Sequence, residues 1–433
     1  MAYSIRKAVV ICVLAAAGAL ACAAAAPAAT QPALSPSDVQ AVRLCGVPAP
    51  GRSACLALGL VPRPGRSLPG ARRLRASRLG AAPAAAPSPE VIENPNPLAP
   101  LTPSYLRSAY GVSGTPEPAA TQTIAIVDAY DDPTAEADLA HFSSQFGLPP
   151  CTEKEGCFKK LNQAGKASPL PSVEKGWALE IATDVETVHS VCPSCHILLI
   201  EAASNSDENL FEAEETAASH GATEITNSWG GGEPASDSPA FNHPHIVITA
   251  SAGDYGYDNW LIESEGEADY PASSPHVVAV GGTRLAQTAG KWEGENVWND
   301  GGEEEGVKTG YGAGGGGCSP FFSAPTWQSS VAGWAAIGCS GNRAVADVAA
   351  DADPLTGVNV YDTTGWSGSK AEEKGWAVLG GTSVASPMIA SVFALAGGAG
   401  GVEYPARTLY EHIGSSGLHD VTAGSNGECL KPL

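Results

Sequence analysis

One serine of this sequence lies where a protein could make it a nucleophile. Residues 380–398, GGTSVASPMIASVFALAGG, begin with two glycines and continue as a small apolar run, which predicts a buried helix with Ser383 in its first turn. The free N–H groups and positive end of such a helix favour negative charge that develops beside the hydroxyl. Pro387 is compatible with the first turn, where its missing N–H is not needed. A bare Gly-Thr-Ser is usually only a helix cap, and a nucleophilic serine also needs a base.

Two acidic residues lie one turn apart on a second predicted helix. In KGWALEIATDVETVHSV, residues 175–191, Glu180 and Asp184 are i, i+4 neighbours. Such a pair is ordinarily a solvated acidic face, but this one lies on or beside the apolar stripe of the helix, while Glu186 is turned elsewhere. Burial and mutual repulsion both raise a carboxyl pKa, so one member could act as a base at low pH while the other orients it.

A third acidic residue follows a predicted strand. Asp254 lies in SAGDYG, directly after the apolar run HIVITA. An aspartate flanked by glycines is usually only a turn former. After a parallel strand, however, it would lie at the sheet edge where active sites form.

The elements that would position these residues alternate between strands and helices. Predicted strands cover residues 122–129, 194–201, 223–228, 245–250, 276–280 and 343–349, and predicted helices cover residues 133–146, 175–189, 206–220 and 384–396. This alternation implies right-handed crossovers and an α/β fold with a doubly wound, mostly parallel twisted sheet and helices on both faces. The glycine-rich residues 301–340 are predicted to be irregular.

In their order along the chain, from Glu180 and Asp184 through Asp254 to Ser383, the three motifs resemble those of the sedolisins, the serine-carboxyl peptidases, which have a subtilisin-like fold. The likeness runs from about residue 100 to residue 433 and includes TNSWGGGE and HDVTAGSNG. It implies that Glu180 is the general base for Ser383 and that Asp184 holds Glu180 in place. Asp254 would be protonated and would donate to the oxyanion. The implied activity is hydrolysis of peptide bonds of proteins or peptides through a serine acyl-enzyme in the acid range.

The resemblance also implies binding residues. Ser228, Trp229 and Gly230 would pair with the substrate backbone as an added strand. Asp420 and the carbonyl of Val421 match the first part of the structural Ca²⁺ site of the family, whose later Gly-x-Gly-x-Asp part has no counterpart before residue 433. Calcium is therefore an expected cofactor with an incomplete set of ligands, since Ca²⁺ takes six to eight oxygens. The peptidase domain is expected to be truncated at its C-terminus.

The N-terminal residues predict export. Residues 1–28 combine basic residues, an apolar run and an alanine-rich stretch, which is typical of a secretory signal peptide. Lipid attachment at Cys22 is the alternative. Residues 29–97 are predicted to be a short basic prosegment with a linker, and residues 98–433 a peptidase domain. We expect a secreted, extracellular monomer without stable membrane association.

Charge divides unevenly along the chain. Residues 1–80 hold ten Lys and Arg against one Asp, and the remainder holds 14 basic and 45 acidic residues, for a net charge of −22. Such an acidic body excludes nucleic acid as a partner. We expect the chain's own basic prosegment to bind this body and to leave as the pH falls and carboxylates become neutral; a disordered basic spacer is the alternative.

Cysteine spacing predicts disulfides, which an exported protein can form. The close sequence pairs are Cys45–Cys55, Cys151–Cys157, Cys192–Cys195 and Cys318–Cys339. Cys192-Pro-Ser-Cys195 also fits a redox or zinc motif, although no second ligand pair stands at the required spacing. Cys429 is left without a partner.

Two other functions compete with the acid peptidase. One is a histidine-based subtilisin-type protease, for which Asp128 follows the first predicted strand but none of the nine histidines has the required context. His189 lies at a helix end, where it complements the helix dipole. The other is a catalytically inactive secreted binding domain.

Overall fold

The computed structural model describes residues 39–63, 101–114, 122–257, 267–288, 291–300, 303–304, 307–308, 312–367 and 372–427. The predicted signal peptide, the linker, Cys22 and Cys429 lie outside these residues. Within them, no helix has the length and apolar character needed to cross a membrane.

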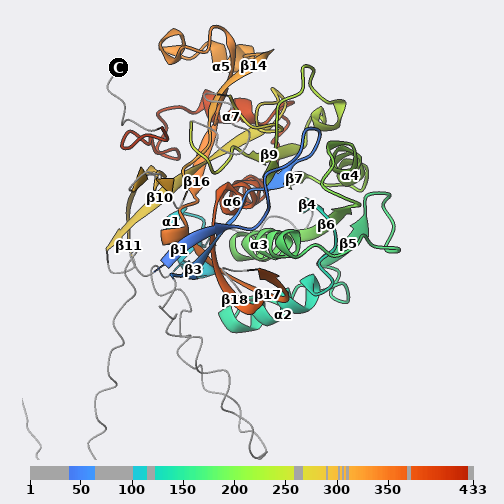
Figure 1. Ribbon diagram of the computed structural model, residues 1–433. Helices are drawn as coiled ribbons and strands as arrows, with labels where there is room; N and C mark the ends of the chain where they lie inside the picture. Colours follow the sequence, from blue (N-terminus) through green and yellow to red (C-terminus); the bar gives the residue numbers. More distant parts are fainter. Residues whose placement is uncertain are drawn as a thin grey trace, which may run out of the picture. The chain divides into compact units, whose positions relative to one another are not determined.

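A predominantly parallel sheet organises the described part of the chain (Figure 1). Its strand order is β11 (Lys291–Val297), β10 (Val278–Thr288), β9 (Val247–Ser251), β7 (Glu224–Asn227), β4 (Thr123–Ala129), β6 (His196–Ala202) and β5 (Phe158–Asn162), with β16 (Val348–Asp351) also paired to β10. Only β10 and β11 pair antiparallel. The expected doubly wound α/β fold is therefore confirmed.

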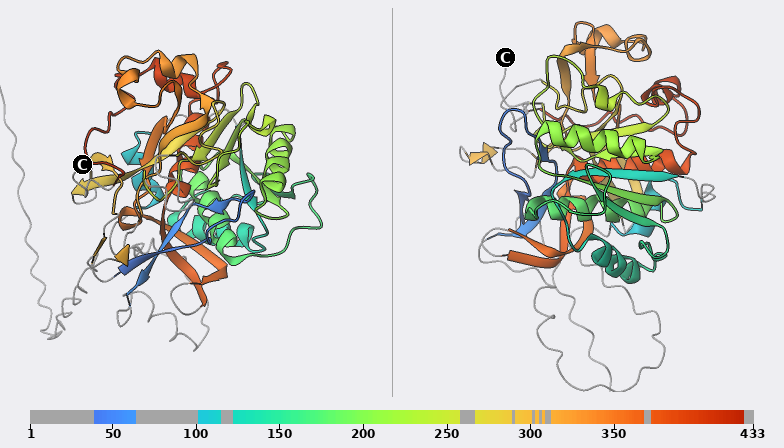
Figure 2. Two further views of the ribbon diagram at one scale, coloured as in Figure 1. Left: turned by 45° about the horizontal axis from the view of Figure 1, so that its top comes forward. Right: turned by 90° about the vertical axis from the view of Figure 1, so that its right-hand side faces the viewer.

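Strand β4 explains why helices cover both faces of the sheet. Ile124 and Ile126 belong to the buried cluster that includes α3 (Lys175–Val191) and α6 (Thr382–Leu395). Ala125 and Val127 belong to a second cluster, with α4 (Asp207–Ser219). Because successive side chains of a strand point to opposite faces, a strand that is apolar at every position is buried on both. Figure 2 (right) shows α4 and α2 (Ala135–Phe146) on opposite sides of the sheet.

Helix α3 is buried over its whole length rather than along one stripe. Every residue from 176 to 191 is buried, because α2, α6 and strand β17 (Val358–Ser367) pack around it. Glu186 points away from Glu180 and Asp184, as expected, but it is buried too, and one of its oxygens accepts the Tyr361 N–H at 2.9 Å. A solvated acidic face is therefore excluded for this helix.

A second, antiparallel sheet incorporates part of the predicted prosegment. Its order is β1 (Val39–Arg43), β3 (Leu58–Pro62), β18 (Glu372–Gly380) and β17. The two-residue strand β2 (Ala54–Cys55) pairs with β8 (Trp229–Gly230). Leu58 and Val61 lie in the same core cluster as α3 and α6. The described residues 39–63 are thus built into the fold, although the sequence of this region predicts little periodic structure.

The glycine-rich region contains more structure than its composition predicts. β14 (Gly317–Ser323) pairs with β15 (Asn342–Val345), and the strand predicted over residues 343–349 is divided between β15 and β16. The remaining short elements are α1 (Pro103–Ala109), α5 (Thr326–Ser329), α7 (Ala406–Glu411), β12 (Glu303–Glu304), β13 (Val307–Lys308) and 3-10 turns at Pro239–Phe241, Trp334–Ile337 and Pro354–Thr356.

All four predicted disulfides are present. Cys192 and Cys195 therefore form a structural bridge rather than a metal site. The bridge between Cys45 and Cys55 closes a loop immediately before Leu56.

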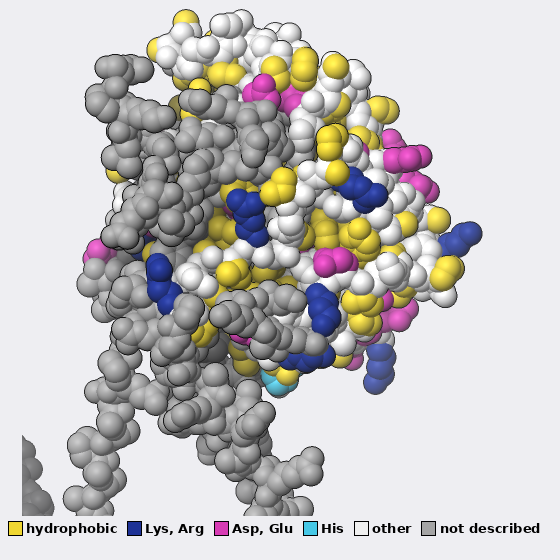
Figure 3. All heavy atoms as spheres, viewed as in Figure 1, with side chains coloured by type: hydrophobic (Ala, Val, Ile, Leu, Met, Phe, Trp, Pro, Cys, Tyr) yellow, Lys and Arg dark blue, Asp and Glu magenta, His cyan; other side chains and the backbone are white. Residues whose placement is uncertain are grey.

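Much of the acidic charge lies inside the protein. Among the described residues, fifteen Asp and Glu residues are buried, against a single buried Lys or Arg residue, Arg343. Figure 3 shows acidic side chains at several places on one face, with basic side chains between them. Burial raises the pKa of Glu224 from 4.5 to about 7 and that of Glu214 well above its usual value. Such groups bind their proton more tightly in the folded state than in the unfolded one.

We predict that the protein is more stable at pH 4 than at pH 8. A carboxyl whose folded pKa is raised contributes stability that is complete below its unfolded pKa and is lost as the pH rises through its folded pKa. For Glu224 the shift from 4.5 to about 7 corresponds to on the order of 3 kcal/mol. Calorimetric unfolding should therefore give a higher Tm at pH 4.

Glu214→Gln, which keeps the shape of the side chain and removes its titration, should reduce that difference in Tm. Glu208 is exposed on the same helix, and Glu208→Gln should leave the difference unchanged. A wild-type Tm that is equal at the two pH values, or higher at pH 8, would contradict the prediction.

Candidate functional site

Ser383 lies in the first turn of α6, where its N–H has no partner within the helix. Gly381 precedes the helix with φ 105°, a conformation that favours glycine. The Ser383 N–H donates to the carbonyl oxygen of Leu56 at 3.0 Å. Its hydroxyl donates to the Ser228 carbonyl at 3.2 Å. Ser383 is fully buried, so bulk water does not compete for either group.

Glu180 and Asp184 meet Ser383 from helix α3. Both oxygens of Glu180 are buried, and no described residue satisfies them with hydrogen-bond geometry. The side chain of Ser383 nevertheless lies close enough to Glu180 to lower the pKa of its carboxyl. The serine and a candidate base are therefore adjacent.

Burial is the main reason why the pKa values of this acidic pair are raised. The pKa of Glu180 lies well above 4.5 because of desolvation and the nearby Asp184. The pKa of Asp184 is also raised by burial, although a 2.7 Å hydrogen bond from the Ser228 hydroxyl opposes the shift. Two adjacent buried carboxyls cannot both ionise easily, so the pair retains one proton after losing the first.

A third carboxyl, Asp128, extends this pair. It is fully buried near the carboxyl end of β4, and its pKa is raised by desolvation and then by Asp184 and Glu180. The sequence marked Asp128 only as a counterpart of a subtilisin aspartate. The position of Asp128 at the carboxyl end of a predicted strand is the sequence signal that could have placed it near the site.

Asp254, just beyond β9, has the properties of an acid. One carboxylate oxygen accepts both the N–H of Thr382 at 2.7 Å and the Thr382 hydroxyl at 2.8 Å. The other oxygen is buried without a described partner. Desolvation raises the pKa to about 7, with Asp269 adding to the shift and the Thr382 bonds opposing it. Below that pH Asp254 holds a proton, and the unpartnered oxygen is the one free to donate it.

Two potential donors lie near one carbonyl oxygen, that of Leu56. A Cβ placed on Gly381 would meet both the Leu56 oxygen and the unpartnered oxygen of Asp254, so these two atoms lie against the same glycine. The Ser383 N–H already donates to the Leu56 oxygen. An N–H group and a carboxylic acid arranged around a carbonyl oxygen can stabilise negative charge that develops there.

The predicted substrate-binding residues lie beside this point. β8 pairs antiparallel with β2, with Ala54 opposite Gly230 and Cys55 opposite Trp229. The Ser228 carbonyl accepts the Leu56 N–H at 3.0 Å. A backbone edge that can bind an extended peptide therefore runs from Ser228 to Gly230.

The predicted calcium ligands are not supported by their surroundings. Asp420 is exposed and Val421 is half-buried. In the described part of the chain, Asp420 belongs to neither cluster of three side chains that could hold a metal. One carboxylate and one carbonyl fall short of the six to eight oxygens that Ca²⁺ requires. These two residues therefore do not fit the ion by themselves.

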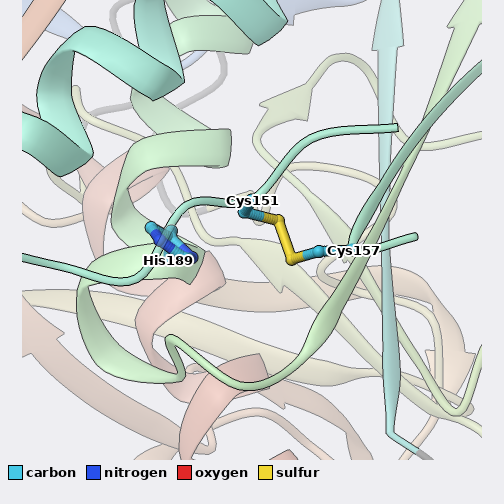
Figure 4. A group of neighbouring side chains, drawn as sticks. All are labelled: Cys151, Cys157 and His189. Atoms are coloured by element: carbon cyan, nitrogen blue, oxygen red, sulfur yellow. A yellow bond between two sulfur atoms is a disulfide. The ribbon is translucent and has the colours of Figure 1, made fainter. Parts of the chain in front are cut away.

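Both of those clusters are engaged in contacts within the protein. One contains His189 with Cys151 and Cys157, but both sulfurs are committed to a disulfide (Figure 4). The other cluster consists of Asp132, Asp138 and Asp362. Their oxygens accept hydrogen bonds from hydroxyl and amide groups of Thr134, Thr363, Thr364 and Gly365.

Known proteins are similar to this chain in sequence. Residues 172–401, more than half of the chain, match the profile of the subtilase family. The chain is 34% identical over 270 residues to kumamolisin of Bacillus sp. (strain MN-32). The aligned region covers 57% of this chain and 44% of the relative. The chain is also 28% identical over 349 residues to sedolisin of Pseudomonas sp. (strain 101), and this aligned region covers 75% of this chain and 56% of the relative. The chain thus spans about half the length of these curated relatives.

A solved structure is similar as well. It is Pseudomonas sedolisin (serine-carboxyl proteinase) complexed with two molecules of pseudo-iodotyrostatin. The TM-score is 0.61 at 27% identity, and the match covers 76% of this chain and 89% of that one.

We predict that Thr382→Val raises the pKa of Asp254 above about 7, because the lost hydroxyl bond favours the ionised form. The carboxyl signal can be followed by ¹³C NMR and assigned by its disappearance in Asp254→Asn. Thr356→Val is the matched control, since its buried hydroxyl donates to a different carboxyl, that of Asp351, at 2.6 Å. An Asp254 pKa that falls or stays constant in Thr382→Val would contradict the assigned contact.

Proposed function

The chain belongs to the subtilase family, and we propose that it is a serine-carboxyl peptidase that hydrolyses peptide bonds of proteins in the acid range. The observation that carries the proposal is the buried, unsatisfied carboxyl of Glu180 beside the hydroxyl of Ser383. A carboxylate in that position can remove the hydroxyl proton without an imidazole. The similarity to a serine-carboxyl proteinase supports the same chemistry.

In the proposed reaction, Ser383 attacks the carbonyl carbon of the substrate while Glu180 takes the hydroxyl proton. Asp184, which accepts a hydrogen bond from the Ser228 hydroxyl, orients Glu180. The two carboxyl groups share the one proton that the pair retains. The Ser383 N–H and protonated Asp254 stabilise the tetrahedral oxyanion. The proton then passes to the leaving amine, and water hydrolyses the acyl-enzyme to release the second product.

The histidine-based alternative lacks a base at the right place. All nine histidines lie in the described residues, and none hydrogen-bonds Ser383. His189, on the neighbouring helix α3, directs one ring nitrogen to the Pro149 carbonyl oxygen at 2.8 Å. Burial lowers its pKa, which disfavours an imidazolium there.

The remaining expectations form part of the same proposal. A secreted location follows from residues 1–28 and agrees with the four disulfides. The substrate would bind as a strand along Ser228, Trp229 and Gly230. Calcium has no role in the proposed steps, because Asp420 and Val421 do not fit the ion by themselves.

We predict that Ser383→Ala lowers kcat/KM for a quenched fluorescent peptide by about four to six orders of magnitude at pH 4–6. The assay should use both the wild-type chain and Leu56→Pro, because the segment around Leu56 contacts Ser383. Ser391→Ala is the control: this serine lies on the same helix, but its hydroxyl is bonded to the Pro387 carbonyl at 2.8 Å. If neither the wild-type protein nor the Leu56→Pro variant shows Ser383-dependent hydrolysis between pH 2 and 8, the proposed function is wrong.

Replacing Glu180 should reduce activity more than replacing another buried carboxyl of the same helix. Glu180→Gln cannot accept the proton and should lower kcat by about 10²–10⁴-fold. Glu186→Gln, in the same helix and equally buried, should retain most of the activity. Equal losses in the two variants would contradict the role given to Glu180.

The pH dependence should report Asp254. Its pKa of about 7 means that the required proton is present below pH 7 and lost above it, so activity should fall about tenfold per pH unit above 7. Asp254→Asn cannot titrate and should show no such decline, although its acid-range kcat should be lower by about 10²–10³-fold. A kcat/KM profile with an unchanged alkaline limb in Asp254→Asn would exclude this assignment.

A further inference from the structure

Three buried aspartates that the proposed reaction does not use meet where α2, α3 and β17 pack together. Asp132 lies just before α2, Asp138 lies in the first turn of α2, and Asp362 lies in β17. Each is at most 3% exposed, and one carboxylate oxygen of each lies within 4.8 Å of the other two. Figure 1 shows the three elements side by side. We call these residues the aspartate cluster.

A fourth buried carboxyl, that of Glu186 on α3, lies against this cluster. Its Oε2 accepts the N–H of Tyr361, the residue before Asp362 in β17. After desolvation, the charges of the three clustered aspartates are what raise the pKa of Glu186. Glu186 is 2% exposed, and its Oε1 has no described partner; the same holds for Oδ2 of Asp132, which is fully buried. Two buried oxygens at this place therefore lack a donor.

Hydrogen atoms are too few for the oxygen contacts inside the cluster. The Thr134 hydroxyl oxygen lies 3.1 Å from Asp132, 2.6 Å from Asp138 and 2.9 Å from the Thr364 hydroxyl oxygen. The Thr364 hydroxyl in turn lies 2.6 Å from Asp132. Two hydroxyl groups supply two hydrogen atoms, whereas these four contacts need one each. Ionised aspartates here therefore require additional positive charge.

No basic side chain among the described residues supplies that charge. Lys160 forms its ion pairs with Asp131 and Glu201 and reaches Asp132 only at the backbone carbonyl oxygen, at 2.8 Å. Buried carboxylates are strongly unfavourable unless they are paired or coordinate a metal. The missing partner is thus a cation from solution or a set of bound protons.

The chemistry of the cluster suits a hard divalent cation. Carboxylate and hydroxyl oxygens are the ligands that such ions prefer. The 4.8 Å limit equals two Ca²⁺–O bonds of about 2.4 Å, whereas Mg²⁺ requires bonds of about 2.1 Å and retains several waters. Thr134, Thr363 and Thr364 are only half-buried, so the cluster lies just beneath the surface, where an ion can enter.

We propose that Asp132, Asp138 and Asp362 bind one Ca²⁺ ion, with the hydroxyl oxygens of Thr134 and Thr364 as further ligands. The ion joins β17 to α2, and both elements pack against α3.

This site differs from the calcium site expected near the end of the chain, because it shares no residue with Asp420 and Val421. Its binding of calcium does not depend on the proposed peptidase activity. Its contribution is to hold the elements that surround α3, the helix that carries Glu180 and Asp184.

The first test is isothermal titration of the full chain with CaCl₂ at pH 7.5, after treatment with EDTA and desalting. The wild-type protein should bind calcium with a Kd of about 1 mM or lower. Asp132→Asn and Asp362→Asn should each weaken binding at least about tenfold, and Asp420→Asn, the matched control, should leave it unchanged. No binding by the wild-type protein, or binding that only Asp420→Asn removes, would overturn the inference.

Thermal unfolding at pH 7.5 separates a lost ligand from a damaged fold. Asp132→Asn keeps the oxygen that accepts the threonine hydrogen bonds and replaces the unpartnered one with an amide group. About 10 mM CaCl₂ should raise the Tm of the wild-type protein by at least about 3 °C and leave that of Asp132→Asn unchanged. Asp362→Asn answers the same question if Asp132→Asn does not fold.

The same measurement with MgCl₂ should give a smaller rise in Tm, because Mg²⁺ demands shorter bonds in a stricter geometry. An equal response of the wild-type protein and the folded variant to calcium would overturn the inference. So would a wild-type Tm that calcium does not change, which would leave a hydrogen-bonded acidic cluster without a metal.

Discussion

The burial of carboxyl groups with few cationic partners is the constraint on which the rest of this structure depends. Asp128, Glu180, Asp184 and Asp254 are withdrawn from water at one edge of the sheet, and desolvation is the largest cause of each raised pKa. A carboxyl that keeps its proton near neutrality can donate, and one that shares a proton can accept. The same burial links the chemistry of the site to the pH at which the fold is most stable.

The fold creates this environment by covering α3 on all sides. The parallel sheet, α6 and the β17–β18 hairpin together exclude solvent from a helix that carries three acidic side chains near its centre. Residues 39–63 contribute to the same cover, since β3 joins β18 and Leu56 is hydrogen-bonded to both Ser228 and Ser383. The segment that contacts Ser228 and Ser383 therefore also contributes to the burial that raises the pKa values of these acids.

Several elements could be predicted because their cause is local. The apolar runs of β4, β6, β7 and β9 and the pattern of α4 predicted a doubly wound sheet with boundaries close to the observed ones. Close cysteine spacing predicted four disulfides that are all present. By contrast, β5, β14 and the β17–β18 hairpin were not predicted. β5 pairs with β6, and β18 also pairs with β3, from which other elements separate them in the chain, so their local composition carries little signal.

What the sequence by itself determined is the set of candidate catalytic residues: a serine at a helix start, two acids one helical turn apart and an aspartate after a strand. These patterns are local, and the periods of helix and strand decide which side chains share a face. Only the tertiary structure decided that Asp128 joins the acidic pair, that no histidine reaches Ser383, and that Leu56 lies in the site. Desolvation and contacts between distant segments arise when the chain packs, and local sequence patterns do not encode which segments meet.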